Sequence, residues 1–211
     1  ATVRIDKLAE ITGSVLIDHV TEADGLQYVF APTRAPSERE ELYNVREAPY
    51  GALGDGVAND TDAFQEALDD AGDTGGTVYV PPGYYVIDEP LTVPSGAELR
   101  GPFQTPHTSE TLDSAVLATT YGVATETPNS DQAFITLEAD AGVRGLTVHH
   151  PDQDLGDPVA YPFVFRGTGA DVYLRDVTVT GAYNVVDFGV HAVDDFVIDG
   201  LWANALNIGV Y

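Results

Sequence analysis

The chain has 211 residues, of which 34 are acidic and 9 are basic, so its formal net charge is −25. Hydrophobic residues make up 44% of it, which excludes a disordered acidic tail, and the negative charge argues against a nucleic-acid partner. The absence of cysteine excludes disulfides, a thiolate nucleophile and a cysteine-based metal site.

The same charge predicts a protein that works in very concentrated salt. A folded chain this acidic repels itself in dilute buffer, whereas at molar salt the Debye length falls to roughly 3 Å and screens the repulsion. We therefore expect a halophilic archaeon, or a virus of one, as the source, with an ordinary acidic extracellular protein as the alternative. No apolar run approaches the ~20 residues of a membrane span.

The first part of the chain carries strand signals followed by a linker signal. Apolar residues alternate at Val3–Ile5 and at Val15–Ile17, which predicts a small β-rich segment over residues 1–30, a candidate attachment module. Residues 31–42 are rich in proline and charge and are predicted to form a linker.

Residues 50–101 combine a glycine-rich turn, a short helix and two strands. Asp60 or Thr61 is expected to cap the helix, and Gly75-Gly76 to end it. The helix has one apolar stripe, made by Ala63, Phe64, Ala67 and Leu68. A strand over Thr77–Val80 and a turn at Pro81–Gly83 follow.

This segment resembles the N-terminal signature of the pectate-lyase-like superfamily of right-handed parallel β-helices, in which GAxGDGxxDDTxAxQxA precedes GGxVxxPxGxY. The first pattern is matched by Gly51, Ala52, Gly54, Asp55, Gly56, Asp60, Thr61, Ala63, Gln65 and Ala67. The second is matched by Gly75, Gly76, Val78, Val80, Pro82, Gly83 and Tyr85. Asn59 stands where the family often has a first Asp.

The resemblance implies an all-β fold, a right-handed parallel β-helix over residues 43–211 with one short N-terminal capping helix, preceded by the small β-rich segment. The same signature occurs in polygalacturonase-like hydrolases, in lyases, and in viral tailspikes and fibres. It therefore specifies the fold and leaves the function open.

A repeat follows the irregular residues 102–135, which are expected to be an excursion closed by a strand at 134–137. Val143, Leu174 and Ile198 fall in one column of the repeat, and Val148, Val179 and Ala203 fall in another. Coils of variable length that stack the same inward columns are what a β-helix requires. In this superfamily asparagines often stack at a turn, which suggests such a pair for Asn184 and Asn207.

The last residues, 204–211, read as part of a coil, and no polar cap follows them. We therefore expect the chain to be the N-terminal part of a longer polypeptide, truncated at its C-terminal end. The alternative is that another subunit covers the exposed coil.

Candidate catalytic groups are carboxylates, because glycoside hydrolysis needs two of them facing one cleft. Asp194 and Asp195 are the obvious pair, and Asp187 and His191 lie nearby in the sequence. Compared with polygalacturonase-like enzymes, the Asp-Asp is present but no Asn-Thr-Asp precedes it, so solvated turn acids are the alternative reading of this pair.

The sequence also contains candidate metal ligands and candidate sugar-binding aromatic residues. His149, His150 and Asp152 have the side-chain types of a divalent metal site, although adjacent histidines on an extended segment diverge. Strand alternation points Trp202 outward, where it would stack on a sugar, and Tyr183 and Tyr161 are further candidates. We expect no cofactor.

Two functions follow. The first is a virion surface or tail component (tailspike, tail fibre or spike) of a halophilic archaeal virus that binds host surface glycan or glycoprotein. Resemblance to tailspikes implies a homotrimer at the virion surface or outside the cell in high salt, and residues 1–42 would contact other virion proteins. The alternative is a secreted halophilic polysaccharide hydrolase or lyase.

Overall fold

The computed structural model describes residues 41–102, 114–124, 133–191 and 193–211, together with the backbone of three strands in the first 28 residues. These strands, β1 (Arg4–Ile11), β2 (Ser14–Thr21) and β3 (Gln27–Tyr28), form an antiparallel sheet in the order β1-β2-β3. The contacts divide the chain into two units, Ala1–Glu38 and Arg39–Tyr211. Residues 31–40 of the predicted linker lie outside the described residues.

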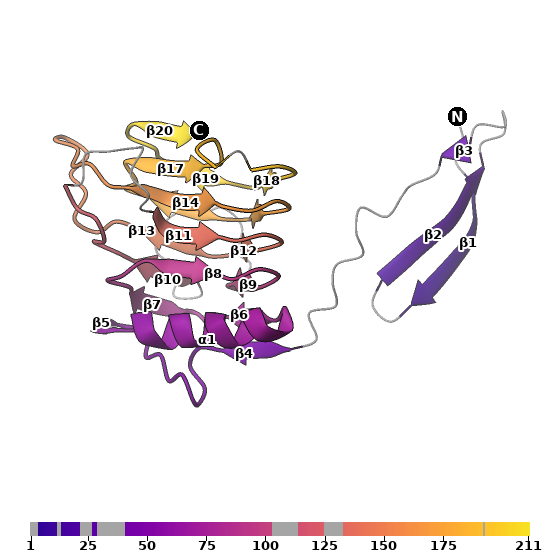
Figure 1. Cartoon of the computed structure of the whole chain (residues 1–211), viewed down its shortest axis with the longest axis horizontal. Helices are drawn as coiled ribbons and strands as arrows, with labels where there is room; N and C mark the ends of the chain where they lie inside the picture. Colours follow the sequence, from indigo (N-terminus) through magenta and orange to yellow (C-terminus); the bar gives the residue numbers. More distant parts are fainter. Residues whose placement is uncertain are drawn as a thin grey trace. The chain divides into compact units, whose positions relative to one another are not determined.

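The second unit is a parallel β-helix, as the sequence predicts, in which successive coils add one strand to each of three parallel sheets (Figure 1). Sheet 1 consists of β4 (Leu42–Asn44), β6 (Thr77–Tyr79), β9 (Glu98–Arg100), β12 (Gly142–Arg144), β15 (Tyr173–Arg175) and β18 (Val197–Asp199). Sheet 2 consists of β5 (Asp55–Asn59), β7 (Gly83–Val86), β10 (Ala115–Ala118), β13 (Thr147–His149), β16 (Thr178–Thr180) and β19 (Trp202–Ala203). Sheet 3 consists of β8 (Leu91–Val93), β11 (Ala133–Leu137), β14 (Phe163–Gly167), β17 (Asn184–Asp187) and β20 (Ile208–Val210).

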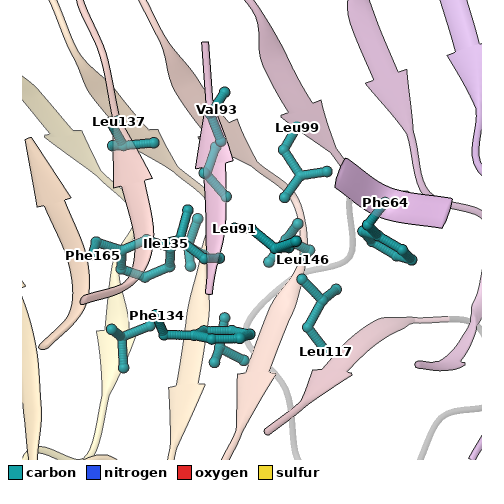
Figure 2. Close-up of a cluster of buried hydrophobic side chains, with 14 of the residues drawn as sticks. Phe64, Leu91, Val93, Leu99, Leu117, Phe134, Ile135, Leu137, Leu146 and Phe165 are labelled. Atoms are coloured by element: carbon teal, nitrogen blue, oxygen red, sulfur yellow. The ribbon is translucent and has the colours of Figure 1, made fainter. Parts of the chain in front are cut away.

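The core is the stack of inward side chains from these sheets. The predicted column is confirmed, since Val143 pairs with Leu174 and Leu174 with Ile198, and the first two are fully buried. In sheet 3, Leu91, Ile135 and Phe165 occupy paired positions on successive strands and follow one another through the interior (Figure 2). Aliphatic burial of this kind supplies the main stabilising free energy of a solenoid.

Helix α1 (Thr61–Thr74) covers the end of the stack that is distant from the C-terminus (Figure 1). Phe64 is fully buried and meets the Tyr85 ring edge-to-face, with 5.1 Å between ring centroids. The Gln65 amide bonds to the backbone of Thr92 through both its oxygen and its nitrogen, at 2.9 and 3.2 Å. The helix therefore covers both apolar side chains and an open strand edge, which would otherwise be exposed.

The start of α1 differs from the expected cap. Asp60 stands at the N-cap position but makes no side-chain cap; its carboxylate accepts hydrogen bonds from the N–H groups of Leu53 and Gly54, at 2.7 and 3.1 Å. Asn59 accepts instead from the Thr61 N–H and hydroxyl, at 3.0 and 2.6 Å. Asp60 thus fixes the preceding glycine-rich loop against the helix.

The expectation for residues 102–135 needs correction, because part of this region is a coil strand. Ala115–Ala118 form β10, which pairs with β7 on one side and β13 on the other, and Leu117 is fully buried. The strand has only four residues, and proline-rich and polar sequence on both sides hid it. The closing strand is β11, as predicted at 134–137.

Turns repeat from coil to coil as the strands do. Gly96, Asp140, Asp171 and Asp195 all have a positive φ, between 54° and 78°, and each precedes a strand of sheet 1. Their backbones join successive coils through bonds such as Asp171 N–H to the Asp194 carbonyl, 3.0 Å. The suggested asparagine pair is confirmed too, since Asn207 Nδ2 donates to Asn184 Oδ1 at 2.9 Å.

Candidate functional site

The outer face of sheet 2 carries a row of side chains that runs along the stack of coils. Tyr84, Val116, Thr147, Thr178 and Trp202 occupy paired positions on β7, β10, β13, β16 and β19. They point away from the core because the next residue on the first four of these strands is buried and inward. Trp202 is 59% exposed and Tyr84 37% exposed, so both rings are accessible from the solvent. The prediction that Trp202 points outward is confirmed.

A second row lies beside the first. His149 and Thr180 hold paired positions, with 2.8 Å between Nδ1 and the hydroxyl oxygen, and the imidazole ring lies edge-to-face with Tyr84, 6.4 Å between centroids. Partial burial lowers the pKa of His149, so the ring is neutral at neutral pH. We call Tyr84, His149, Thr178, Thr180 and Trp202 the sheet-2 face. It offers two accessible aromatic rings and, on the half-buried His149 and Thr180, an imidazole and a hydroxyl, whereas Thr178 is only 8% exposed.

The connection after β13 separates the two histidines. His150 is 2% exposed and packs edge-to-face on Tyr161, 4.6 Å between centroids. Burial, and to a smaller extent the neighbouring His149, lowers the pKa of His150 to about 4. Among the described residues, His150 Nδ1 and the Tyr161 hydroxyl have no hydrogen-bond partner. Tyr161 is itself 1% exposed, so the expectation of a surface ring that stacks on sugar is wrong for this residue.

The structure does not assemble the proposed metal ligands. His149 turns outward to Thr180 and His150 inward to Tyr161, while Asp152 is exposed on the loop that follows. In the part of the chain that the structure describes, no three His, Asp or Glu side chains are placed to hold one metal ion. Alternation along an extended segment separates adjacent side chains in this way.

Asp187 is not an exposed acid but half of a buried ion pair. Its Oδ2 lies 2.8 Å from both Nε and Nη2 of Arg166, and both side chains are almost completely buried. Its Oδ1 accepts from the N–H groups of Gly189 and Val190, at 3.1 and 3.0 Å. Sequence reasoning missed Arg166, although an arginine inside the apolar run of β14 signals a buried carboxylate partner.

The other catalytic candidates lie elsewhere around the coil. His191, Asp194 and Asp195 are exposed on the connection between β17 and β18. Asp195 occupies the same positive-φ turn column as Gly96, so a backbone requirement accounts for it. The structure therefore does not join these residues with the enclosed Asp187. Tyr183 is half-buried in the short turn before β17.

Comparison with known proteins finds similarity over part of the chain. A family model described as "Rhamnogalacturonase A/epimerase, pectate lyase-like" matches residues 42–143. The mannuronan C5-epimerase AlgE2 of Azotobacter vinelandii is 46% identical over 67 residues, which are 28% of this chain and 6% of that protein. The non-secreted LysM effector LysM19 of Penicillium expansum is 44% identical over 52 residues, 25% of this chain and 4% of that one. The chain thus spans only a small part of these relatives.

Solved structures agree on the fold. An iota-carrageenase of family GH82 from A. fortis superposes with a TM-score of 0.55 and 18% identity, covering 84% of this chain and 39% of that one. A candidate glycosyl hydrolase from Parabacteroides merdae gives 0.53 and 18%, covering 81% and 80%. No helix among the described residues is long and apolar enough to cross a membrane. Residues 42–143 therefore match a pectate lyase-like family model, and the superposed structures share the fold of the described coils.

Proposed function

We propose that this β-helix binds a polysaccharide along the sheet-2 face. The observation that carries the proposal is the row from Tyr84 to Trp202, which crosses four strand spacings, about 19 Å, with an exposed ring at each end and the largely buried Thr147 and Thr178 between them. A linear sugar chain lying parallel to the stack would meet rings for its apolar faces and hydroxyl or imidazole groups for its hydroxyls. Relatives named as acting on mannuronan or carrageenan support a polysaccharide ligand.

The setting that we propose is a virion surface or tail component, a tailspike, tail fibre or spike, of a halophilic archaeal virus. The polysaccharide is then a host surface glycan or the glycan of a glycoprotein. Net charge −25 supports a high-salt environment, and the separate three-stranded unit before Arg39 supports a module that contacts other virion proteins. Asp187 supports recognition rather than cleavage, because its carboxylate is already committed to Arg166.

A secreted halophilic polysaccharide hydrolase or lyase is the second candidate. The matched proteins favour it, because the family model is that of a rhamnogalacturonase and epimerase, and the superposed structures include a carrageenase. The two candidates differ in their product and in their assembly. A spike leaves the sugar chain intact and is a stable trimer, whereas an enzyme releases reducing or unsaturated ends.

The test is binding of the whole chain to immobilised mannuronan, polygalacturonate, iota-carrageenan and dextran in high salt, before and after Trp202→Ala. Loss of a 59%-exposed ring leaves the fold intact and is expected to weaken retention roughly tenfold or more. Leu42→Ala, at an exposed apolar residue on β4 of sheet 1, is the matched control. Unchanged retention and unchanged oligomeric mass in Trp202→Ala would refute the proposal. New reducing or unsaturated ends would decide for the enzyme.

A further inference from the structure

Asn59, the last residue of β5, begins the only Asn-X-Thr or Asn-X-Ser triplet in the chain, Asn59-Asp60-Thr61. Such a triplet, with any residue except proline in the middle, is the acceptor sequence for N-linked glycosylation. The other five asparagines are followed two positions later by Arg, Asp, Val, Leu or Gly, so none of them is an acceptor. The contacts and exposure of Asn59 decide whether its amide can carry a sugar.

The amide nitrogen of Asn59 has no part in the fold of the described chain. Thr61 donates its backbone N–H and its hydroxyl to Asn59 Oδ1, at 3.0 and 2.6 Å. An N–H can only donate, so the atom that faces it is the amide oxygen. Nδ2 makes no hydrogen bond with any described residue. A carboxylate here would accept the same two hydrogen bonds, so the turn uses only what Asn and Asp share. The free amide nitrogen is what an asparagine adds.

The surface around Asn59 has room for a bulky substituent. Asn59 is exposed, as are Asp55 and Asp62, and Val57 is 85% exposed. Strand β5 is the terminal strand of sheet 2 at the α1 end of the stack and pairs only with β7 (Figure 1). The pairing shifts in register between Asp55 and Asn59, as at a β-bulge. A sugar on Asn59 would therefore extend into solvent beside an open strand edge.

We propose that Asn59 is a site of N-linked glycosylation and that the attached oligosaccharide covers the open edge of sheet 2. The donor is an oligosaccharide joined to a lipid through phosphate. The bond between its anomeric carbon and the phosphate oxygen breaks, and a bond from Nδ2 to that carbon forms. The lipid phosphate leaves with the electron pair, and one Nδ2 proton passes to a base of the transferase. Oδ1 is unchanged, so both hydrogen bonds from Thr61 persist.

The attached sugar protects the edge that β5 leaves unpaired. An exposed edge strand can pair with the edge of another molecule, and proteins prevent this by covering or charging the edge. An N-linked oligosaccharide is bulky and hydrophilic. Beside the exposed Val57 it would exclude a second copy of the chain from the edge of β5.

Thr61 determines the order of modification and folding. Its side chain is 6% exposed, and its hydroxyl donates to Asn59 and accepts from the Asp88 N–H at 3.0 Å. The acceptor triplet requires this hydroxyl, so the transferase must reach it, and in the folded chain it is enclosed. The sugar is therefore added before α1 packs on the coils, and the folded chain is not an acceptor.

The experiment secretes the whole chain from a halophilic archaeal host whose own surface glycoprotein carries N-glycans, which shows that the transferase is active in the same cells. Asn59→Asp keeps the accepting oxygen and removes the amide nitrogen. Asn204→Asp is the matched control, because Asn204 is also exposed and accepts the Gly181 N–H through Oδ1, at 2.8 Å, but begins no triplet. Mass spectrometry locates the sugar, circular dichroism verifies the fold, and sedimentation velocity measures self-association.

The unaltered chain and Asn204→Asp are expected to carry an oligosaccharide on Asn59, and Asn59→Asp to lose it and to self-associate more. Absence of sugar from Asn59, while the host's own glycoprotein is modified, overturns the site. A glycosylated Asn59 with equal self-association of all three chains overturns the protection of the edge.

A second measurement tests the order of events. Unmodified chain, produced in a bacterium without N-glycosylation and folded in high salt, is added to membranes of the same host, whose activity an unstructured Asn-Asp-Thr peptide verifies. The folded chain should stay unmodified. Its modification at Asn59 would overturn the order while confirming the site.

Discussion

Asp187 on β17 and Arg166 on β14 stabilise the coils to which they belong only as a pair. Both are buried, and Asp187 also accepts two backbone hydrogen bonds from the turn that follows β17. Removing one partner of a buried pair leaves the other charge without compensation, which is costlier than replacing both.

Asp187→Ala is therefore expected to lower the free energy of unfolding by about 3–5 kcal/mol, whereas Asp194→Ala, at an exposed turn position, should change it by less than about 0.5 kcal/mol. Urea unfolding in high salt measures both. The double change Arg166→Met with Asp187→Leu should recover most of the loss. Equal effects of Asp187→Ala and Asp194→Ala would contradict the ion pair as the source of stability.

His150 makes the folding stability depend on pH, and the direction of its pKa shift gives the sign of this dependence. Its pKa is about 4 in the folded chain against 6.5 in the unfolded chain, so between these values the unfolded state binds the extra proton. Stability contributed by the neutral ring is complete above pH 6.5 and is lost as pH falls to about 4, by about 3 kcal/mol in all. His149, whose pKa is also lowered, acts in the same direction.

His150→Phe keeps the contact with Tyr161 and removes the titrating group. The difference in unfolding free energy between the variant and the unaltered chain should shift in favour of the variant as pH falls from 6.5 to 4, and it should be constant above pH 7. Urea unfolding at several pH values measures this difference. A difference independent of pH over the whole range would show that His150 is not buried in its neutral form.

At the scale of elements, α1 determines where the stacked core begins. Phe64 brings the largest apolar side chain of the helix into the end of the core, and Gln65 pairs with the open edge of β8. Phe64→Ala should lower the unfolding free energy by about 3–5 kcal/mol, and the exposed Glu66→Ala on the same helix should change it by less than about 0.5 kcal/mol. Thermal and urea unfolding provide the measurement. A loss below about 1 kcal/mol for Phe64→Ala would mean that the core closes without the helix.

Short-range signals made most of these elements predictable. The helix stripe, the Gly75-Gly76 end and the inward columns at Val143 and Val148 depend on residues a few positions apart or on a repeat that the sequence displays. Strand β10 was not predictable, because four residues between proline-rich stretches carry too little periodicity. Its place is decided by the neighbours β7 and β13.

Site residues were less predictable because their environment comes from other coils. Asp187 meets Arg166 at a distance of 21 residues, and the ring of Tyr161 is enclosed by contacts that no local pattern records. The outward position of Trp202 could be predicted, since it depends only on alternation next to Leu201 and Ala203. The role of Asp60 in holding Leu53 and Gly54 depends on loop geometry that the motif alone does not contain.

At the scale of the whole molecule, the net charge determines how stability depends on salt. With a formal charge of −25, repulsion between surface acids opposes the folded state wherever counterions are dilute. The free energy of unfolding should therefore rise as KCl increases from about 0.1 M to 2 M, over which the Debye length falls from about 10 Å to below 3 Å. Thermal unfolding at each salt concentration tests this, with sorbitol of equal osmolality as the control. A thermal unfolding midpoint that stays constant or falls as KCl increases would show that repulsion between surface acids does not limit the stability of the folded chain.

Coil length varies after sheet 2 without any change in core register. One coil runs through residues 150–162 between β13 and β14, and the next needs only residues 181–183 between β16 and β17. Residues 151–160 of the longer connection are exposed or half-buried, and a longer surface segment adds little closure entropy, so the scaffold tolerates either length. Recognition on this backbone can therefore be rewritten by exchanging one segment. A foreign loop in place of residues 152–160 would bring its own specificity, while the buried His150 and Tyr161 and the stacked aliphatic columns keep their geometry.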